Sequence, residues 1–368
     1  MFERILYYTG NPIELSFLFQ MKKQFKEFRP SVNSLEVISQ QTTDEEFCSE
    51  ALKKVSRSFS VVIHQLPKEL QAPVGLFYLI LRGLDTVEDD MSIEQSVKTE
   101  LLNDFASRMN REAFTLSDTG DTQDYKDLMA NFDKVIREYQ KLDSQYKEVI
   151  TDITDRMAFG MNKYVLGAVD SFEDWNDYCH YVAGLVGIGL SKLFIASRIE
   201  QDEKLKNEDL SNEMGLFLQK TNIIRDFAED LDQTRVFWPS IAWNKKVNSL
   251  KELQTNKKVG VEVINELVTN ALNHIPACLT YLESIKNEKV FRFCAIPQLM
   301  AVATLNELYG NENVLTENVK IRKGKTARIF MSKQDIKHVK AEFLTILDSI
   351  YKKDKNPSIH QIIQKING

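Results

Sequence analysis

The sequence predicts an all-α protein, a single-domain bundle of helices around a central cavity. The 368 residues include only 14 glycines and 8 prolines, below the average shares of about 7% and 5%, and 43% of the residues are apolar. Apolar residues recur every three to four positions, which is the helical period. No alternating strand blocks, repeats or low-complexity linkers interrupt this pattern. One large helical core is therefore expected.

Taken in order, the expected elements form three segments: N-terminal helices packed on the core (1–44), the core itself (45–335) and C-terminal helices (336–368). A helical pattern over 45–91 breaks at Leu66-Pro67, because proline lacks an amide donor. A polar loop follows at 115–123. Further helices are expected at 126–165, 175–199, 214–231, 260–286 and 291–308, with an exposed connection at 200–212, a stop at Trp238-Pro239 and a basic segment at 319–325.

Charge and cysteine content exclude several classes of protein. With 53 acidic against 47 basic residues, the net charge is −6, which excludes nucleic-acid binding driven by bulk charge. The cysteines form no CxxC pair, so isolated buried thiols in a reducing compartment are expected, with no zinc site: Cys48, Cys179, Cys278 and Cys294. Glu14 interrupts the N-terminal apolar stretch, which does not fit a signal peptide, and no apolar run approaches the roughly 18 residues of a membrane helix.

Two acidic blocks carry the first chemical signal. Asp85, Glu88 and Asp89 share one face of a predicted helix, because residues three and four apart lie on the same side. Asp226, Glu229 and Asp230 repeat that spacing. Taken alone, either block is also typical of a solvated helix end.

The repetition favours a metal site. Two acidic faces that oppose each other across a bundle can hold magnesium ions, which prefer one or two carboxylates completed by phosphate and water. The chemistry would be departure of a diphosphate, leaving an allylic carbocation in a dry apolar cavity with aromatic faces.

Arginines accompany both blocks and are candidate diphosphate clamps: Arg57, Arg82, Arg225 and Arg235. Ordinary ion pairing is the alternative. Arg82 with Asp85 and Arg225 with Glu229 have the i,i+3 and i,i+4 spacing of helical pairs.

Five stretches resemble the squalene synthases, head-to-head prenyl synthases of the squalene/phytoene synthase family, which also includes phytoene and dehydrosqualene synthases. The resemblance covers most of residues 45–330 and is carried by 56–59, 77–90, 178–189, 214–226 and 293–298. It implies the isoprenoid-synthase-like helical fold and a Mg²⁺-dependent transferase of sterol biosynthesis. The implied reaction joins two farnesyl diphosphates into presqualene diphosphate, which NADPH then reduces to squalene.

The resemblance also assigns site residues. It implies metal binding by Asp85, Asp89, Asp226 and Asp230, to which the helical spacing adds Glu88. It also makes Tyr178 the tyrosine of the first half-reaction, with Tyr181 as the competing candidate and a core tyrosine as the alternative for either. Substrate contacts fall on Arg57, Ser58, Phe59, Tyr78, Arg82, Asn222, Arg225, Arg235 and Phe293.

A nicotinamide site is expected in the basic segment rather than in the glycine-rich stretch. Gly184, Gly187 and Gly189 reverse the order of GxGxxG and follow no strand, so they predict close helix packing. Lys320, Arg322 and Lys323, with Lys325, can grip the 2′-phosphate of NADPH. A solvated basic loop is the alternative, and the resemblance through 319–324 favours the cofactor.

The chain departs from the family in two places. The resemblance implies a C-terminal hydrophobic membrane anchor, and 358–368 lie near where it would begin, so we expect either that the anchor was removed or that this member lacks one. Membrane association, at the cytosolic face of the endoplasmic reticulum, is expected only through such an anchor, and a soluble monomer is expected for the chain as given. The family also has a lysine in the loop before the long helix. No residue of this chain aligns clearly with it, and Lys126 is only a nearby substitute. The alternatives are a presqualene diphosphate or dehydrosqualene synthase without the reductive step, and a prenyl-lipid-binding protein without catalysis.

Overall fold

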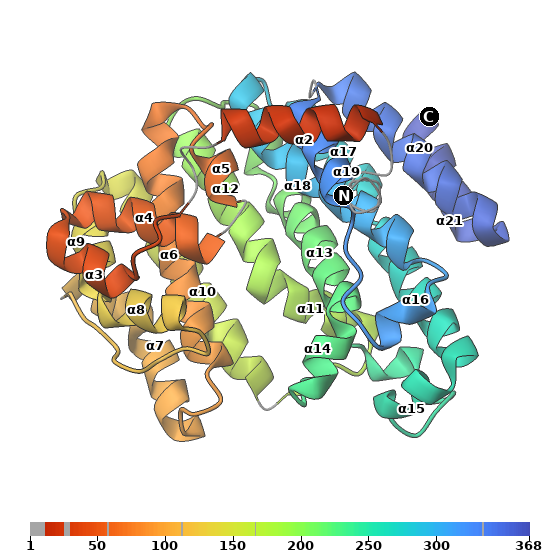
Figure 1. Ribbon diagram of the computed structural model, residues 1–368, viewed down its shortest axis with the longest axis horizontal. Coiled ribbons are helices and arrows are strands. Elements are labelled where there is room, and N and C mark those ends of the chain that lie inside the picture. Colours follow the sequence, from red (N-terminus) through yellow and green to blue (C-terminus); the bar gives the residue numbers. More distant parts are fainter. Residues whose placement is uncertain (1–11, 26–29, 57–58, 112, 166, 333–334) are drawn as a thin grey trace. The chain divides into compact units, whose positions relative to one another are not determined.

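The computed structural model describes residues 12–25, 30–56, 59–111, 113–165, 167–332 and 335–368 (Figure 1). Throughout these ranges the regular structure is helical and no β-strand occurs, which confirms the predicted all-α class. The chain divides into two compact units, each built from discontinuous segments. The predicted boundaries at residues 45 and 335 follow neither unit and stay a prediction.

One unit comprises residues 25–167 and 188–201. In it, α6 (Lys68–Asp89) packs against α4 (Asp44–Ser56), α7 (Gln95–Arg111), α9 (Phe132–Gln140) and α10 (Ser144–Val165). The buried side of α6 is apolar, including Phe77, Ile80 and Leu84. Shorter helices complete this unit: α3 (Leu35–Gln41), α5 (Phe59–Ile63) and α8 (Gln123–Ala130).

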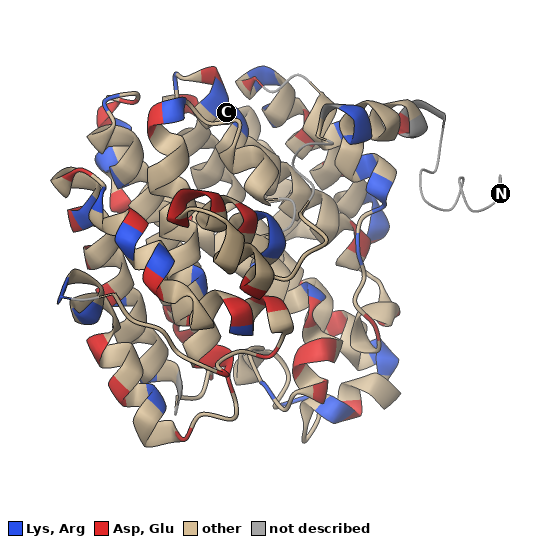
Figure 2. Cartoon of the chain, turned by 60° about the vertical axis from the view of Figure 1, so that its left-hand side comes forward, with Lys and Arg blue, Asp and Glu red and all other residues tan. Residues whose placement is uncertain are grey.

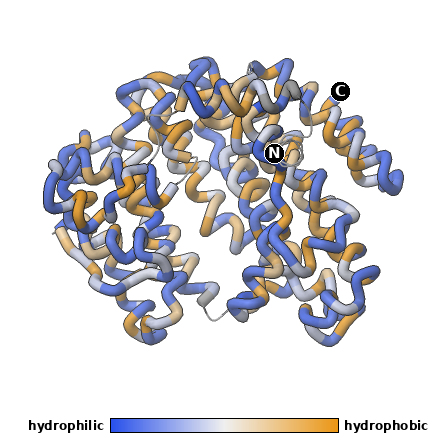
Figure 3. The backbone as a smooth tube through the Cα atoms, viewed as in Figure 1, coloured by the Kyte–Doolittle hydropathy of each residue, from blue (hydrophilic) through white to orange (hydrophobic). Residues whose placement is uncertain are grey.

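The other unit comprises residues 1–24, 168–187 and 202–368. Its central helix α13 (Glu208–Arg225) packs against α11 (Phe172–Cys179), α16 (Lys257–Leu272), α17 (Ile275–Ser284) and α18 (Glu288–Leu308). Around these lie α2 (Pro12–Gln24), α14 (Phe227–Asp232), α15 (Leu250–Thr255), α19 (Lys323–Met331), α20 (Ile336–Asp354) and α21 (Pro357–Asn367). Hydrophobic and hydrophilic segments alternate along the backbone (Figure 3).

Several predicted helices are interrupted. The break at Pro67 is confirmed, since α6 begins directly after it. The single helix expected over 126–165 is wrong: α8 ends before Asn131, and α9 ends before Lys141. The asparagine closes α8 because its backbone leaves the helical region, with φ −120° and ψ 24°.

The charged stretch at 200–212 is also more ordered than expected. A 3₁₀ turn spans Glu203–Lys206, and α13 already begins at Glu208, where the side chain of Asn207 accepts a hydrogen bond from the Asp209 amide. Helix-capping residues therefore start the element earlier than its apolar period indicates. The expected helix over 214–231 is divided at Asp226, between α13 and α14.

The glycine-rich stretch packs closely, as the sequence predicted. A Cβ atom at Gly184 would lie 1.9 Å from Asn212 Oδ1, and one at Gly187 would lie 2.3 Å from the Ser211 carbonyl oxygen. A π-helical turn, His180–Gly184, joins α11 to α12 (Leu185–Ala196). This wide turn was not predicted.

All four cysteines are buried and free, which confirms the isolated thiols. Burial raises the pKa of Cys48 and Cys179 to about 12. In the view of Figure 2, acidic and basic residues are interspersed along the helices, in keeping with the small net charge.

Among the residues that the structure describes, one helical stretch, Phe172–Ala196, is long and apolar enough to cross a membrane by length and composition alone, which the count of consecutive apolar residues did not reveal. Core helices of soluble proteins pass the same test. Gly184 and Gly187, near the middle of this stretch, pack closely on α13.

Candidate active site

The first acidic block lies on the last turns of α6. Asp85 is partly buried, and Asp89, one turn later, is exposed at the end of the helix. The neighbouring Asp90 has a structural role: its carboxylate accepts hydrogen bonds from the amides of Ser92 and Gly120, both at 2.8 Å. The helical spacing of Asp85, Glu88 and Asp89 is therefore confirmed, with Asp90 turned to a loop.

The pKa of Asp85 is raised to about 6, chiefly by burial and further by the charge of Asp89, against the lowering effect of Arg82. Arg82 Nη1 lies 3.4 Å from Asp85 Oδ2, which confirms the i,i+3 ion pair. The buried Nε of Arg82 has no hydrogen-bond partner in the described part of the chain. The ionised carboxylate is thus under-compensated, and the arginine keeps a donor for an oxygen ligand.

Aromatic rings surround this arginine. Its guanidinium lies 5.7 Å from the ring centre of Tyr78 and 5.6 Å from that of Tyr125. Phe59 stacks on Tyr78 with ring centres 6.0 Å apart. Tyr125 was not predicted, because it follows a polar loop that carries no chemical signal of its own. Arg57 and Ser58 lie outside the described residues, and Lys126 lies on α8.

The second acidic block lies in the other unit, where α13 gives way to α14. Arg225 does not pair with Glu229 as its i,i+4 spacing suggested. Its Nε donates to Asp226 Oδ1 at 2.8 Å, because Asp226 leaves the helical conformation with ψ near 11°. Asn318 donates to the same oxygen at 2.7 Å and to Glu229 Oε2 at 3.3 Å.

Asp230 has the same electrostatic character as Asp85. Burial raises its pKa to about 6, with Asp226 and Glu229 adding to the rise and Arg235 opposing it. Arg235 Nη2 lies 3.1 Å from Asp230 Oδ1. Each acidic block therefore contains one partly buried carboxylate whose ionised form a bound cation would stabilise.

Tyr178 lies on α11 and is buried. Its ring stacks on Phe237, with centres 5.2 Å apart and an angle of 17°, and the guanidinium of Arg235 lies 5.8 Å from the Phe237 ring centre. Within one unit, a chain of contacts therefore runs from Tyr178 to Asp230: Tyr178 stacks on Phe237, Arg235 lies against the Phe237 ring, and Arg235 pairs with Asp230. Phe237 was not named from the sequence, since only tertiary packing brings it to Tyr178.

The remaining predicted residues divide between core and surface. Phe293 is buried in α18, Asn222 is partly buried on α13, and the competing Tyr181 lies in the π turn. The basic residues Lys320, Arg322 and Lys323 are exposed, and the last of them begins α19. Arg322 pairs with Glu14 of α2, with 3.3 Å between Nη2 and Oε1.

No group of three or more His, Cys, Asp or Glu side chains in the described ranges forms a ready-made metal cage. The donor sets nevertheless fit magnesium, which takes one or two carboxylates and completes its shell with phosphate and water. The pKa values of Asp85 and Asp230 are raised first by burial and then by neighbouring carboxylates, and a bound cation would offset both effects. The two blocks belong to different units, so their opposition stays a prediction.

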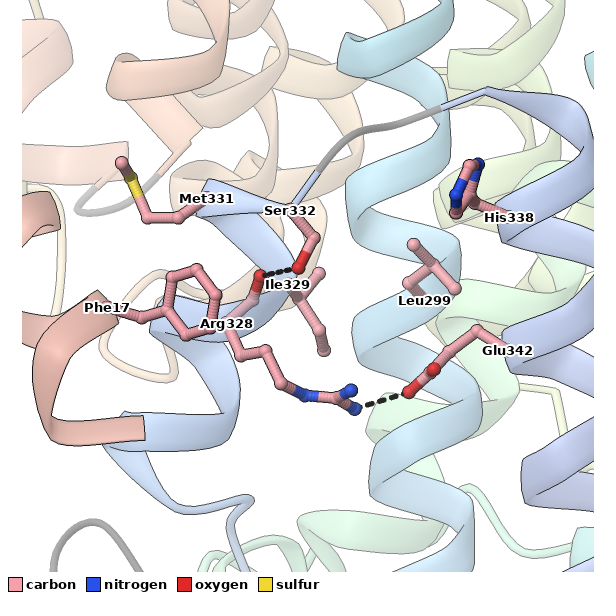
Figure 4. A pocket seen from close by; sticks show the side chains of 8 residues that line it. All are labelled: Phe17, Leu299, Arg328, Ile329, Met331, Ser332, His338 and Glu342. Atoms are coloured by element: carbon pink, nitrogen blue, oxygen red, sulfur yellow. Dashed lines mark hydrogen bonds and ion pairs between the residues drawn. The ribbon is translucent and has the colours of Figure 1, made fainter. Parts of the chain in front are cut away.

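A pocket of about 490 Å³ lies apart from these residues, among α2, α18, α19 and α20 (Figure 4). Phe17, Leu299 and Ile329 give it an apolar wall, while Arg328 at its edge is paired with Glu342. It contains none of the predicted site residues.

Comparison with known proteins identifies the family. The model of the squalene/phytoene synthase family matches residues 52–325, a range that includes both acidic blocks. A squalene synthase of Nicotiana benthamiana is 47% identical over 302 residues, covering 81% of this chain and 72% of the relative. One of Schizosaccharomyces pombe is 42% identical over 326 residues, covering 86% and 71%.

A solved structure agrees with the sequence relatives. TcSQS, in complex with the ligand E5700, matches with a TM-score of 0.84 and 38% identity over 88% of this chain and 97% of that chain. The fold and the acidic blocks thus define a helical prenyl synthase. The chain belongs to the squalene/phytoene synthase family, and its relatives of 41–48% identity are squalene synthases.

Proposed function

We propose that the protein is a squalene synthase that joins two farnesyl diphosphates into presqualene diphosphate and reduces this product with NADPH to squalene. The observation that carries the proposal is the pair of arginine-flanked acidic blocks, both inside the family match at 52–325. In the first half-reaction a carbon–carbon bond and a cyclopropane form while one diphosphate and one proton leave. In the second, the other diphosphate leaves and a hydride is added.

Magnesium would be held by Asp85, Glu88 and Asp89 in one unit and by Asp226 and Asp230 in the other. When bound, it supplies positive charge to the leaving diphosphate. Arg82, Arg225 and Arg235 orient the diphosphate oxygens through charge-assisted hydrogen bonds. Arg82 suits this role because its Nε has no partner in the described chain, and Arg57, Ser58 and Asn222 are proposed as further substrate contacts.

Tyr178 is proposed to accept or relay the proton lost when the cyclopropane forms, aided by the departed diphosphate. Its ring, stacked on Phe237, presents a π face that stabilises a nearby cation. Phe59, Tyr78 and Phe293 are proposed to supply apolar surface to the substrate, which keeps water from the cation.

NADPH would be held at its 2′-phosphate by Lys320, Arg322 and Lys323, and it supplies the hydride. These side chains are exposed and cationic at the start of α19, which fits an anionic group. Because squalene is a hydrocarbon that partitions into membranes, we propose that the enzyme acts at the cytosolic face of the endoplasmic reticulum. We further propose that it acts as a monomer.

The product of the purified protein tests this proposal. Farnesyl diphosphate and Mg²⁺ are supplied with and without NADPH, and the extracted lipids are identified by mass spectrometry. Squalene formed only with NADPH is the expected result. The same hydrocarbon with or without NADPH would indicate a dehydrosqualene synthase, and binding without turnover would indicate a prenyl-lipid-binding protein.

A further inference from the structure

A lysine lies buried where three helices of one unit meet. Lys220 of α13 is 1% exposed. Its Nζ lies 2.5 Å from Asn176 Oδ1 on α11, 2.6 Å from Asn270 Oδ1 on α16 and 2.9 Å from His274 Nε2 after α16. The Trp175 ring centre is 4.8 Å away. None of the chemistry proposed above uses this lysine.

The ammonium group is fully matched by its surroundings. It has three N–H donors, and three acceptors receive them. His274 can accept at Nε2 only if its proton is on Nδ1, which lies 2.6 Å from Glu213 Oε2. Lys220 is thus linked to Glu213 by two hydrogen bonds through the imidazole of His274.

Such an arrangement is costly to bury. Desolvation lowers the pKa of Lys220 to about 8, and a buried ion is retained only when its hydrogen bonds are complete. The network therefore holds its three helices at one spacing, because moving any of them would leave a donor of Lys220 without its acceptor.

The hydrogen bond from Lys220 to Asn176 reaches the helix that carries the proposed catalytic tyrosine. Tyr178 lies two residues after Asn176, a rotation of about 200° around the helix axis. Asn176 therefore anchors one side of α11 while Tyr178 points from the other side onto Phe237. A second contact, between His180 Nδ1 and Asn212 Oδ1 at 2.8 Å, holds the π turn to α13.

We propose that Lys220 is a positioning residue for the condensation step, which fixes α11 through Asn176 so that Tyr178 keeps its place beside Phe237 and Arg235. The inference rests on the proposed function of Tyr178. The hydrogen bond from Lys220 to Asn270 reaches α16, which carries none of the proposed site residues. Its loss therefore serves as the comparison for the loss of the hydrogen bond to Asn176.

The test compares Asn176→Ala with Asn270→Ala in the full chain. Each variant removes one acceptor from the same ammonium group, so similar losses of thermal stability are expected. We expect kcat for pyrophosphate release from farnesyl diphosphate to fall 10- to 100-fold in Asn176→Ala, the size that small misplacements cause. KM should change little. Asn270→Ala should keep kcat within about twofold, a change too small to indicate displacement of a reacting group.

Asn176→Asp supplies the rescue, because its carboxylate restores an acceptor to Lys220, and it keeps the test valid if the alanine variant fails to fold. Recovery of at least half of the wild-type kcat supports positioning. Equal kcat losses in Asn176→Ala and Asn270→Ala, or no recovery in a folded Asn176→Asp, would overturn it. A wild-type protein that releases no pyrophosphate would instead refute the proposed function, and the inference with it.

Discussion

Removing the charge of Asp85 is expected to stabilise the protein when no metal is present. Asparagine has nearly the same shape as aspartate and mimics its neutral form. The pKa of about 6 in the fold, against 3.8 as the ordinary value, means that the folded protein disfavours the ionised carboxylate. A difference of roughly 2 pKa units corresponds to about 3 kcal/mol.

Solvent screening reduces this figure, because the side chain of Asp85 is 28% exposed. About 1–2 kcal/mol is therefore expected at pH 7.5, which raises the melting temperature by roughly 1–3 °C in a chain of this size. The sign follows from proton binding. Between pH 3.8 and about 6 the native state binds more protons at Asp85, so wild-type stability falls as the pH rises through this window. The advantage of Asp85→Asn appears there and is constant above it.

The assay is thermal unfolding of both proteins at pH 7.5, in EDTA and in millimolar Mg²⁺. Magnesium that binds only the folded wild type stabilises it by mass action. The difference in melting temperature between Asp85→Asn and wild type should therefore shrink or change sign in Mg²⁺. Asp152→Asn is the control, because Asp152 is 46% exposed and paired with Lys192. The reasoning would be refuted if Asp85→Asn melted at a lower temperature than wild type in EDTA. It would also be refuted if Mg²⁺ raised the melting temperature of Asp85→Asn as much as that of wild type.

Three further predictions concern the fold. Burial lowers the pKa of His274 below 6.5, so at this residue the unfolded chain binds more protons than the folded one as the pH drops below that value. Asp85 and Asp230 act in the opposite sense in any variant that keeps them, so urea unfolding at pH 7 and 5.5 should show that the wild type loses stability relative to His274→Gln, and an equal change in the two proteins would contradict this. Gly187→Ala should cost about 1–3 kcal/mol, since its Cβ meets the Ser211 carbonyl oxygen at 2.3 Å, whereas Gly75→Ala, with 3.5 Å to Leu52, should gain about 0.5–1 kcal/mol in the same denaturation assay. The buried thiols, including Cys48, should not react with a disulfide reagent at pH 8 until the protein unfolds; reaction of the native protein would show the burial to be wrong.

Local pattern was enough to predict the all-α class and the helical spacing of the acidic residues on α6. Asp85 and Asp89 lie one turn apart on α6 because helical spacing is a property of the sequence itself. The closeness of Gly187 to Ser211 was also foreseeable, since runs of small residues in an apolar helix indicate tight packing.

Tertiary contacts could not be read in this way. Nothing near Phe237 or Asn318 in the sequence indicates that the first stacks on Tyr178 or that the second donates to Asp226. The break at Asn131 was missed because the apolar period of α8 and α9 continues through it. Pairing of Arg225 with Asp226 instead of Glu229 depends on a backbone turn that periodicity does not encode.

The central claim is that both acidic blocks act together when the diphosphate departs. Pyrophosphate release from farnesyl diphosphate with Mg²⁺ tests it, in the wild type, Asp85→Asn, Asp226→Asn and the control Asp232→Asn, whose aspartate is exposed on α14. Release should be abolished in the first two variants, with their helical circular dichroism intact, and retained in the control. Full activity in either Asp85→Asn or Asp226→Asn would contradict the account.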